Sequence, residues 1–218
     1  MLYEKIAFNN LNSFSQVDHL ISKYDLIIET NFVRRKIVFY QQLKEYFKGK
    51  GLLKIKVKGG NWGLASNALH LIDLCNFLTS QNAPEVFVNK SKLNVVPSKR
   101  VGYLELTGTY ILETSAWSLE LISESSNNDP HLIMIRNNKE QYVIDEIKKV
   151  LTLPSGKKLN FKFPYQSQLT NQYLDRLMIC GNSGLTNFEE TKYIHKIFFE
   201  NLSQYSELMD EKERLLIT

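Results

Sequence analysis

The sequence predicts an α+β fold in which helices cover one face of a large, mostly antiparallel sheet. Three observations predict it: the first 31 residues have the pattern strand, helix, strand; several strand-like runs separated by polar turns occupy the middle; and two helical segments close the chain. Helices and strands that are segregated along the chain in this way are typical of α+β proteins. The sequence shows no internal repeat and no low-complexity linker.

The N-terminal residues predict a parallel βαβ unit. LYEKIAF and DLIIETNF have strand character, and the helix between them begins at Asn12 or Ser13 and continues through Tyr24. Either side chain suits a helix N-cap, and a strand, crossover helix and strand form a parallel unit. Two parallel strands alone do not make a stable sheet, because such strands are normally buried on both faces. We therefore expect residues 1–31 to be the last strands of a doubly wound domain whose earlier strands are absent, and residues 32–218 to form a second, α+β domain.

The second predicted domain begins with a helix and a strand. RRKIVFYQQLKEYFKGKG has an apolar stripe at helical spacing and a natural stop at Gly49. LLKIKVKGG alternates lysines with apolar residues, as expected of a strand with one solvated face. Lys54, Lys56 and Lys58 are more typical of an edge strand that resists aggregation than of a polyanion site.

The remaining elements follow in order. GGNWGLASNALHLIDLCNFLTS predicts a buried helix, and five strand-like runs come next: EVFVNK, RVGYLELTGTYILETS, WSLELISES, HLIMIRN and EQYVIDEIKKVLTL. Polar stretches such as SSNNDP and RNNKE suit hairpin turns between them. Two helices close the chain, the first ended by Gly181 and the second opened by Asn187.

Composition and charge exclude several classes of protein. The chain has 218 residues, of which 43% are hydrophobic and 23% charged, and its net charge of +4 is too mild to predict nucleic-acid binding. Only Cys75 and Cys180 are present, which argues against a disulfide-stapled secreted domain and predicts a cytoplasmic location. The N-terminus lacks the apolar core of a signal peptide. The apolar run at residues 64–78 contains five polar residues, so we expect no membrane span.

A row of polar residues on the predicted buried helix, here called the polar seam, is a candidate catalytic or binding feature. Ser66, His70 and Asp73 are spaced i, i+4 and i+7, which places them on one side of the helix, and Asn67 lies beside Ser66. Two interpretations are open. The seam presents a histidine to a cleft, or His70 is a core residue whose ring nitrogens are satisfied locally, for instance by Asp73.

The sequence resembles the Gfo/Idh/MocA family of glucose-fructose oxidoreductases and inositol dehydrogenases. The resemblance is carried by LYEKIAFNNLNSFSQVDHLI, ETNFVRR and GGNWGLASNALHLIDL, in that order. In that family a Glu-Lys-Pro motif ends a Rossmann strand and an arginine follows the last such strand. A helix of the second domain carries an Asp-x-x-x-His pair followed by Ile-Asp. The resemblance implies the fold of that family and an NAD(P)-dependent oxidoreductase acting on a sugar or cyclitol-like alcohol. It also implies that residues 1–31 are the terminal remnant of a dinucleotide-binding (Rossmann) domain and that residues 32–218 form a substrate-binding and oligomerisation domain.

By position, the resemblance implies roles for five residues. Glu4 and Lys5 match the Glu-Lys pair, with Ile6 in place of proline, and Lys5 would reach the nicotinamide and the reacting hydroxyl. His70 matches the histidine that exchanges the substrate hydroxyl proton, a task suited to a pKa near neutrality. Asp73 would orient the helix or the ring. Ser66 stands where many members have the catalytic aspartate, and a serine cannot raise the basicity of the histidine.

The cofactor half of such an enzyme has no counterpart in the sequence. The Gly-x-Gly-x-x-Gly turn that seats a dinucleotide pyrophosphate does not occur among the ten glycines. We expect NAD(P) to bind a full-length protein and not this chain alone. Arg34 is a candidate for holding a carboxylate or phosphate, although such arginines are more often ion-paired. Trp62 either stacks on a sugar ring or packs beneath the turn. His19, His131 and His195 lack partners at metal-site spacing, so no metal is expected.

Two functions from different classes remain open on the sequence. The leading one is the substrate-binding and oligomerisation portion of the oxidoreductase described above. The alternative is a non-catalytic sugar-binding or assembly module that keeps the fold without the redox half. The sequence also predicts a homodimer through the uncovered face of the sheet, because strand-like runs with apolar residues on both faces would expose a large apolar patch in a monomer.

Overall fold

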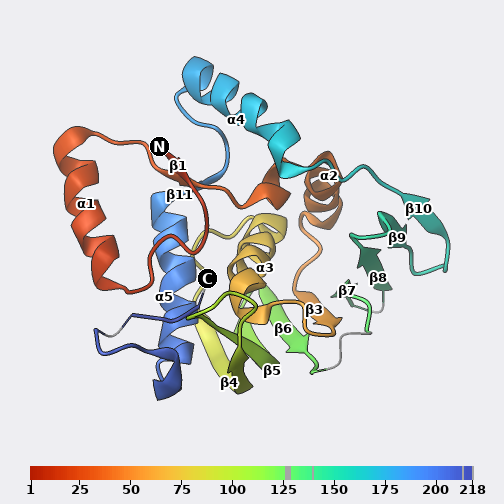
Figure 1. Ribbon diagram of the computed structural model, residues 1–218. Coiled ribbons are helices and arrows are strands. Elements are labelled where there is room, and N and C mark those ends of the chain that lie inside the picture. The colour runs from red at the N-terminus through yellow and green to blue at the C-terminus, as the bar shows by residue number, and fades with distance from the viewer. Residues whose placement is uncertain (126–128, 139, 213, 218) are drawn as a thin grey trace.

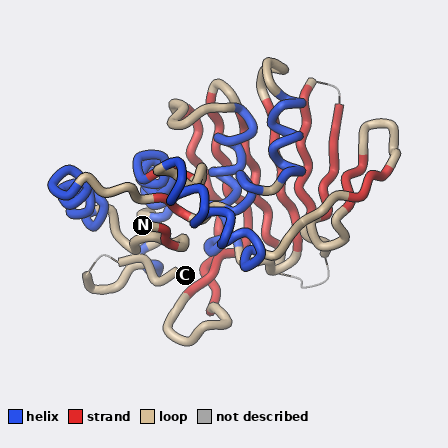
Figure 2. Tube along the Cα trace, turned by 90° about the horizontal axis from the view of Figure 1, so that it is seen from above, coloured by secondary structure: helices blue, strands red, loops and turns tan. Residues whose placement is uncertain are grey.

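An eight-stranded sheet and a smaller three-stranded sheet organise the protein, with five α-helices packed around them (Figure 1). The computed structural model describes residues 1–125, 129–138, 140–212 and 214–217, and these counts refer to those residues. The predicted α+β class is confirmed. Helices α2, α3 and α5 gather on one side of the large sheet, which Figure 2 shows after a quarter turn.

The large sheet has the order β10-β9-β8-β7-β3-β6-β5-β4 and is mostly antiparallel, as predicted; within the order only β3 and β6 pair in parallel. The strands are β3 (Leu53–Gly59), β4 (Val86–Pro97), β5 (Leu104–Thr114), β6 (Trp117–Ser123), β7 (Leu132–Asn137), β8 (Glu140–Asp145), β9 (Val150–Thr152) and β10 (Lys158–Asn160). The run EQYVIDEIKKVLTL forms two strands, β8 and β9, and the short exposed β10 was not predicted.

The lysine-rich strand β3 lies in the middle of the sheet, so its assignment as an edge strand is wrong. It pairs with β6 on one side and β7 on the other. Its lysines point to the uncovered face, where Lys56 and Lys58 form ion pairs of 2.9 Å and 2.8 Å with Glu120 and Glu124. Alternation within the strand determines which face carries the lysines, but only pairing with distant strands determines whether the strand is central. The uncovered face is therefore more polar than the sequence suggested.

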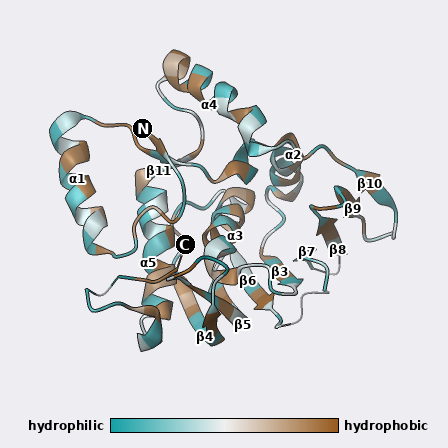
Figure 3. Cartoon of the chain, viewed as in Figure 1, coloured by the Kyte–Doolittle hydropathy of each residue, from teal (hydrophilic) through white to brown (hydrophobic). Residues whose placement is uncertain are grey.

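Three helices supply the core over the other face. They are α2 (Val38–Phe47), α3 (Leu64–Thr79) and α5 (Phe188–Leu202). The predicted apolar stripe of α2, Ile37, Tyr40, Leu43 and Phe47, is buried throughout. Figure 3 shows hydrophobic residues on β4 and β5, whereas α1 and α4 carry hydrophilic residues along much of their length. The helix expected from Arg34 is divided: a 3₁₀ turn, η1 (Val33–Lys36), precedes α2 because Ile37 has an extended backbone.

The small sheet confirms a parallel strand pair at the N-terminus. Strands β1 (Leu2–Tyr3) and β2 (Glu29–Thr30) are parallel and flank α1 (Asn12–Tyr24), and β11 (Thr186–Asn187) pairs with β2 in antiparallel fashion. Strand β11 was not predicted, because two residues give no sequence pattern. The first turn of α1 is capped from upstream, where Asn10 Oδ1 accepts from the backbone N–H of Ser13 at 2.9 Å. The expected caps, Asn12 and Ser13, lie inside the helix.

The remaining helical elements are α4 (Gln166–Cys180) and η2 (Ser206–Leu208). As predicted, Gly181 ends α4 in a left-handed conformation, and the side chain of Asn187 caps α5 by accepting from the N–H of Glu190. Both cysteines are free thiols; Cys75 is buried in α3 and Cys180 is exposed at the end of α4. Across the described ranges, no helix combines the length and apolar character that a membrane crossing requires.

Candidate functional site

Helix α3 presents the polar seam, and a tight turn fixes where the helix begins. Gly63 has φ +76°, and a Cβ at that position would lie 2.7 Å from Ser66 Oγ, so the turn favours glycine on two grounds. The carboxylate of Glu105 on β5 accepts from the backbone N–H of Ala65 at 2.6 Å. A carboxylate at a helix N-terminus stabilises both the unpaired N–H groups and the helix dipole. The start of α3 is thereby fastened to the large sheet.

Ser66 and Asn67 direct their side chains back to this turn. The hydroxyl of Ser66 donates to the carbonyl of Gly63 at 3.1 Å, and Asn67 Nδ2 donates to the same carbonyl at 2.9 Å. Both residues therefore help to close the turn that begins α3. Asn67 also lines a pocket, which is described below.

Lys5, in the N-terminal segment, also contacts helix α3. It follows β1, and its ammonium donates to the backbone carbonyl of Ser66, one helical turn before His70. Burial lowers the pKa of Lys5, Glu4 and Glu105 oppose that shift, and Arg34 adds to it. Lys5 and His70 are thus brought close although they are far apart in the sequence. The Lys5–Ile6 peptide bond is cis.

His70 is held as a neutral imidazole with one nitrogen open. Burial, followed by the positive charges of Arg34 and Lys5, lowers the pKa of His70 well below its ordinary value of 6.5. Its Nδ1 is buried and has no hydrogen-bond partner among the described residues, and the edge of its ring packs against Phe32 with centroids 5.3 Å apart. A neutral imidazole with a free nitrogen can accept a proton.

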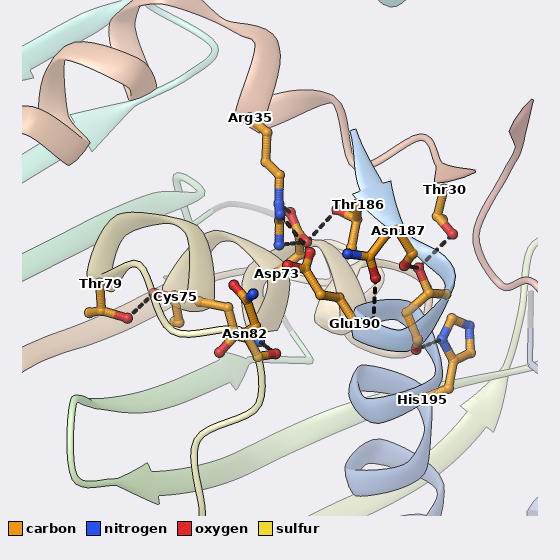
Figure 4. A network of polar contacts seen from close by, with 12 residues as sticks. Thr30, Arg35, Asp73, Cys75, Thr79, Asn82, Thr186, Asn187, Glu190 and His195 are labelled. Atoms are coloured by element: carbon orange, nitrogen blue, oxygen red, sulfur yellow. Dashed lines mark hydrogen bonds and ion pairs between the residues drawn. The ribbon is translucent and has the colours of Figure 1, made fainter. Parts of the chain in front are cut away.

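Asp73 is bound to other residues (Figure 4), and it does not satisfy Nδ1 of His70. Its Oδ1 accepts from Thr186 Oγ1 at 2.6 Å and lies 2.8 Å from Arg35 Nη2, while Oδ2 accepts from Arg35 Nε at 3.0 Å. Arg35 also pairs with Glu190 on α5 at 2.7 Å. Burial raises the pKa of Asp73, and Arg35 opposes that shift. This network joins α3 to η1, β11 and α5, so Asp73 fixes the helix and makes no hydrogen bond to the imidazole.

The other residue of the Glu-Lys pair lies at the surface. Glu4 is exposed, and its Oε1 accepts from Asn31 Nδ2 at 2.9 Å and from Gln166 Nε2 at 2.6 Å. These bonds tie the segment after β1 to the end of β2 and to the first residue of α4. The contacts keep Lys5 in place from its N-terminal side.

Arg34, expected as a candidate for an anion, is paired within the chain. Its Nε and Nη2 donate to the two carboxylate oxygens of Glu146 at 2.8 Å and 2.7 Å, and Tyr40 donates to the same carboxylate. Burial opposes the charge on Arg34, but Glu146 keeps the pKa of the guanidinium above its ordinary value. A bidentate pair of this kind is geometrically specific, so an incoming anion would have to compete with Glu146.

A pocket of about 310 Å³ opens beside this pair. Arg34, Glu146 and Asn67 contribute polar groups to its lining, together with Trp62 and His131. The indole of Trp62 is held by a bond from Nε1 to the carbonyl of Ile122 at 2.9 Å, and its ring lies against His131 with centroids 4.9 Å apart. His70 does not line this pocket; Asn67 and Leu71, its neighbours on α3, do.

Sequence reasoning missed two polar residues of this pocket, Glu146 and His131. The Nε2 atom of His131 is buried and has no partner among the described residues, and burial lowers the pKa of this histidine. The only local signal was its place at the start of an apolar strand, and its proximity to Trp62 depends on the sheet. No three His, Cys, Asp or Glu side chains in the described part of the chain lie in an arrangement that could hold a metal ion.

Comparisons with known proteins agree on the fold. No family model matches the sequence, and a comparison with curated proteins finds no match. Among solved structures, the chain is similar to the dehydrogenase MviM from Clostridium difficile, with a TM-score of 0.66 and 14% identity over 93% of this chain and 70% of that one.

Two further structures give the same picture. UDP-N-acetylglucosamine 3-dehydrogenase GnnA from Acidithiobacillus ferrooxidans has a TM-score of 0.68 and 10% identity, with 92% of this chain and 68% of that one covered. The WlbA (WbpB) dehydrogenase from Thermus thermophilus, solved with NAD and UDP-GlcNAcA, has a TM-score of 0.54 and 16% identity, with 93% and 63% covered. The chain therefore has the fold of Gfo/Idh/MocA-type oxidoreductases, as its resemblance to that family predicts.

Proposed function

We propose that this chain is the substrate-binding and oligomerisation portion of an NAD(P)-dependent oxidoreductase that acts on a sugar or cyclitol-like alcohol. The observation that carries the proposal is the convergence of Lys5 and His70 on one turn of α3, beside a pocket whose walls are polar and aromatic. Several hydrogen-bonding side chains beside the indole of Trp62 suit a polyhydroxylated ring.

The chain's own residues supply binding and proton movement in this proposal. His70 is neutral at pH 7, and its buried Nδ1, which has no hydrogen-bond partner among the described residues, accepts the proton of a reacting hydroxyl that is bound against the ring. Lys5 holds the oxygen of that hydroxyl by an ammonium N–H bond, which favours the developing negative charge. Ser66 contributes no carboxylate that would raise the basicity of His70, and burial together with Arg34 and Lys5 lowers it, so the ring is a weaker base than a free histidine.

The dinucleotide does not fit the N-terminal unit of this chain. Such a ligand uses free N–H groups at a helix start and a glycine-rich turn. Here the segment between β1 and α1 contains no glycine, and the side chain of Asn10 already accepts from the first turn of α1. We therefore propose that NAD(P) is bound elsewhere in a full-length protein. Calorimetric titration of the chain with NADH and NADPH should give no saturable heat, and micromolar binding would contradict this.

Substrate binding tests the central claim directly. The chain should bind a sugar or cyclitol from a panel that includes D-glucose, myo-inositol and UDP-N-acetylglucosamine. His70→Gln and Lys5→Met should each weaken that binding about tenfold, the effect expected when a hydrogen bond to a charged or buried partner is lost. His19→Gln is the matched control, because His19 is exposed on α1. Failure of the whole panel to bind, or equal binding by all variants, would remove the proposal.

The alternative is a non-catalytic sugar-binding or assembly module with the same fold. The polar pocket beside Trp62 and His131 favours it, because this pocket does not need a cofactor to bind a sugar. Sugar binding that persists in the His70 and Lys5 variants would support the module. An in-frame coding sequence with a glycine-rich turn upstream of Met1 would support the enzyme.

We also propose a homodimer through the uncovered sheet face, and a cytoplasmic location. Apolar side chains such as Ile122 and Met134 remain half-buried on that face among the lysine–glutamate pairs. Packing two such faces around a two-fold axis would bury them. Light scattering across a micromolar concentration series should give the dimer mass, and a monomer mass at every concentration would refute the dimer.

A further inference from the structure

A second cavity, of about 600 Å³, lies between α2 and the β8–β10 end of the large sheet. It shares no lining residue with the pocket beside Arg34. Its volume is within the range of small-molecule sites, which are mostly apolar with a few placed polar groups. The function proposed above does not use this cavity.

The body of the cavity is apolar and aromatic. Leu43 on α2 and Leu151 on β9 are buried on its walls. Phe39 lies flat against Phe161, with ring centroids 3.8 Å apart and planes 8° from parallel. Each ring covers one face of the other, and both rings line the cavity, so this wall is made of aromatic carbon. A planar aromatic molecule would therefore match the shape of the wall and bury its faces against carbon.

One end of the cavity is polar, and the tyrosine hydroxyl protons there are already used in hydrogen bonds within the chain. Tyr142 donates to Oε2 of Glu140 at 2.8 Å. The hydroxyls of Tyr46 and Tyr142 are also hydrogen-bonded to each other, and because the proton of Tyr142 goes to Glu140, the proton of this second bond comes from Tyr46. The second carboxylate oxygen of Glu140 accepts no hydrogen bond from the described residues. This end thus offers an acceptor and no hydroxyl proton.

The charge at this end selects a neutral ligand. Lys50 lies over the ring of Tyr46, with Nζ 3.2 Å from the ring centroid, and it does not line the cavity. Glu140 and Lys50 act on the pKa of Tyr46 with opposite signs, so both charges lie at this end of the cavity and a second cation gains little there. We propose that this cavity is a binding site for a neutral aromatic molecule that carries one N–H or O–H donor, with the donor directed to Glu140 and the ring against Phe39 and Phe161.

Indole and 1-methylindole test the proposal, because they differ in the single donor. Calorimetry and amide chemical-shift titration of the intact chain should show that indole binds about tenfold more tightly than 1-methylindole, the ratio expected for one hydrogen bond to a charged acceptor. Glu140→Ala should reduce the affinity for indole to that for 1-methylindole. Glu113→Ala, which removes an exposed glutamate on β5, should leave the preference intact.

A second variant keeps the test independent of the hydrogen bond. Leu159 lines the rim of the cavity and is 39% exposed, so Leu159→Trp can fill the space without disturbing the core. This variant should weaken both ligands. Equal affinities of the two ligands for the unmodified chain, no binding of either, or binding unchanged by Leu159→Trp would each overturn the proposal. None of these outcomes bears on sugar binding at Lys5 and His70.

Discussion

Lowering the pH from 7 to 4 should destabilise the protein through His195, a fully buried residue on α5. Its Nδ1 lies 2.8 Å from the carbonyl of Thr191, and its Nε2 accepts from the backbone N–H of Ala7 at 3.2 Å. This histidine therefore joins the N-terminal segment to α5 and must be neutral to do so, because a protonated Nε2 cannot accept. Burial lowers its pKa from 6.5 to about 4, while the bond to Thr191 opposes the shift.

The direction and size of the effect follow from these two pKa values. Between pH 6.5 and pH 4 the unfolded chain binds a proton at His195 and the folded chain does not, so the free energy of unfolding falls as the pH falls through this window. Below the folded pKa the loss is complete. A shift from 6.5 to about 4 corresponds to about 3 kcal/mol of lost stability. Above pH 6.5 the contribution is fully present and constant.

Comparison with His195→Phe isolates this residue from other titrating groups. Phe14 and Phe199 pack against the imidazole with centroids 5.0 Å and 5.7 Å away, so a phenyl ring suits the site. Urea unfolding followed by circular dichroism at pH 7, 6, 5 and 4 gives the free energy of unfolding of both proteins. The free energy of unfolding of the unmodified protein, minus that of the variant, should fall by about 3 kcal/mol between pH 7 and pH 4. His70 and His131 titrate in both proteins and cancel, so a gap independent of pH would refute the reasoning.

Two further substitutions test the packing of the fold. Gly108→Ala should lower the free energy of unfolding by about 3 kcal/mol or more, because φ is +108° and the new Cβ would lie 2.3 Å from the carbonyl oxygen of Lys92. Gly102→Ala, at φ +81° with open space around it, should lower it by about 1 kcal/mol. Thermal denaturation of both variants checks the difference, and equal losses would contradict it. Thr186→Val should lower the free energy of unfolding by about 2 kcal/mol, because it leaves Asp73 Oδ1 with one partner fewer. Thr170→Val, on the exposed face of α4, should change it by less than about 0.5 kcal/mol. If chemical denaturation gave similar values for both variants, the role assigned to the Asp73 network would be excluded.

The elements that the sequence predicted well are those whose signals are local. The apolar stripe of α2 and the alternation of β3 repeat at the period of the structure they form, so the buried face follows from the spacing alone. Gly181 and Asn187 likewise act within one turn of their own helices, as the terminator of α4 and the cap of α5. A resemblance of short motifs in the right order was enough to predict the fold.

The candidate site was predicted only in part. The resemblance pointed to Lys5 and His70, which lie near each other in the structure, but the sequence could not identify the partners of the residues around them. Asp73 shares a helix face with His70, yet its oxygens are bonded to Arg35 and Thr186. Such partners are set by the packing of segments that are distant in the chain, and no spacing within one segment encodes them.

Alternation and helical periodicity therefore determined which residues of each segment are buried, because a strand or helix exposes its faces according to its own geometry. The tertiary structure alone decided which segments meet. It made β3 a central strand and paired the two-residue β11 with β2. It also paired Arg34 with Glu146 and placed His131 beside Trp62. These are contacts between surfaces far apart in sequence, and their geometry exists only once helices and sheet have packed around a shared core.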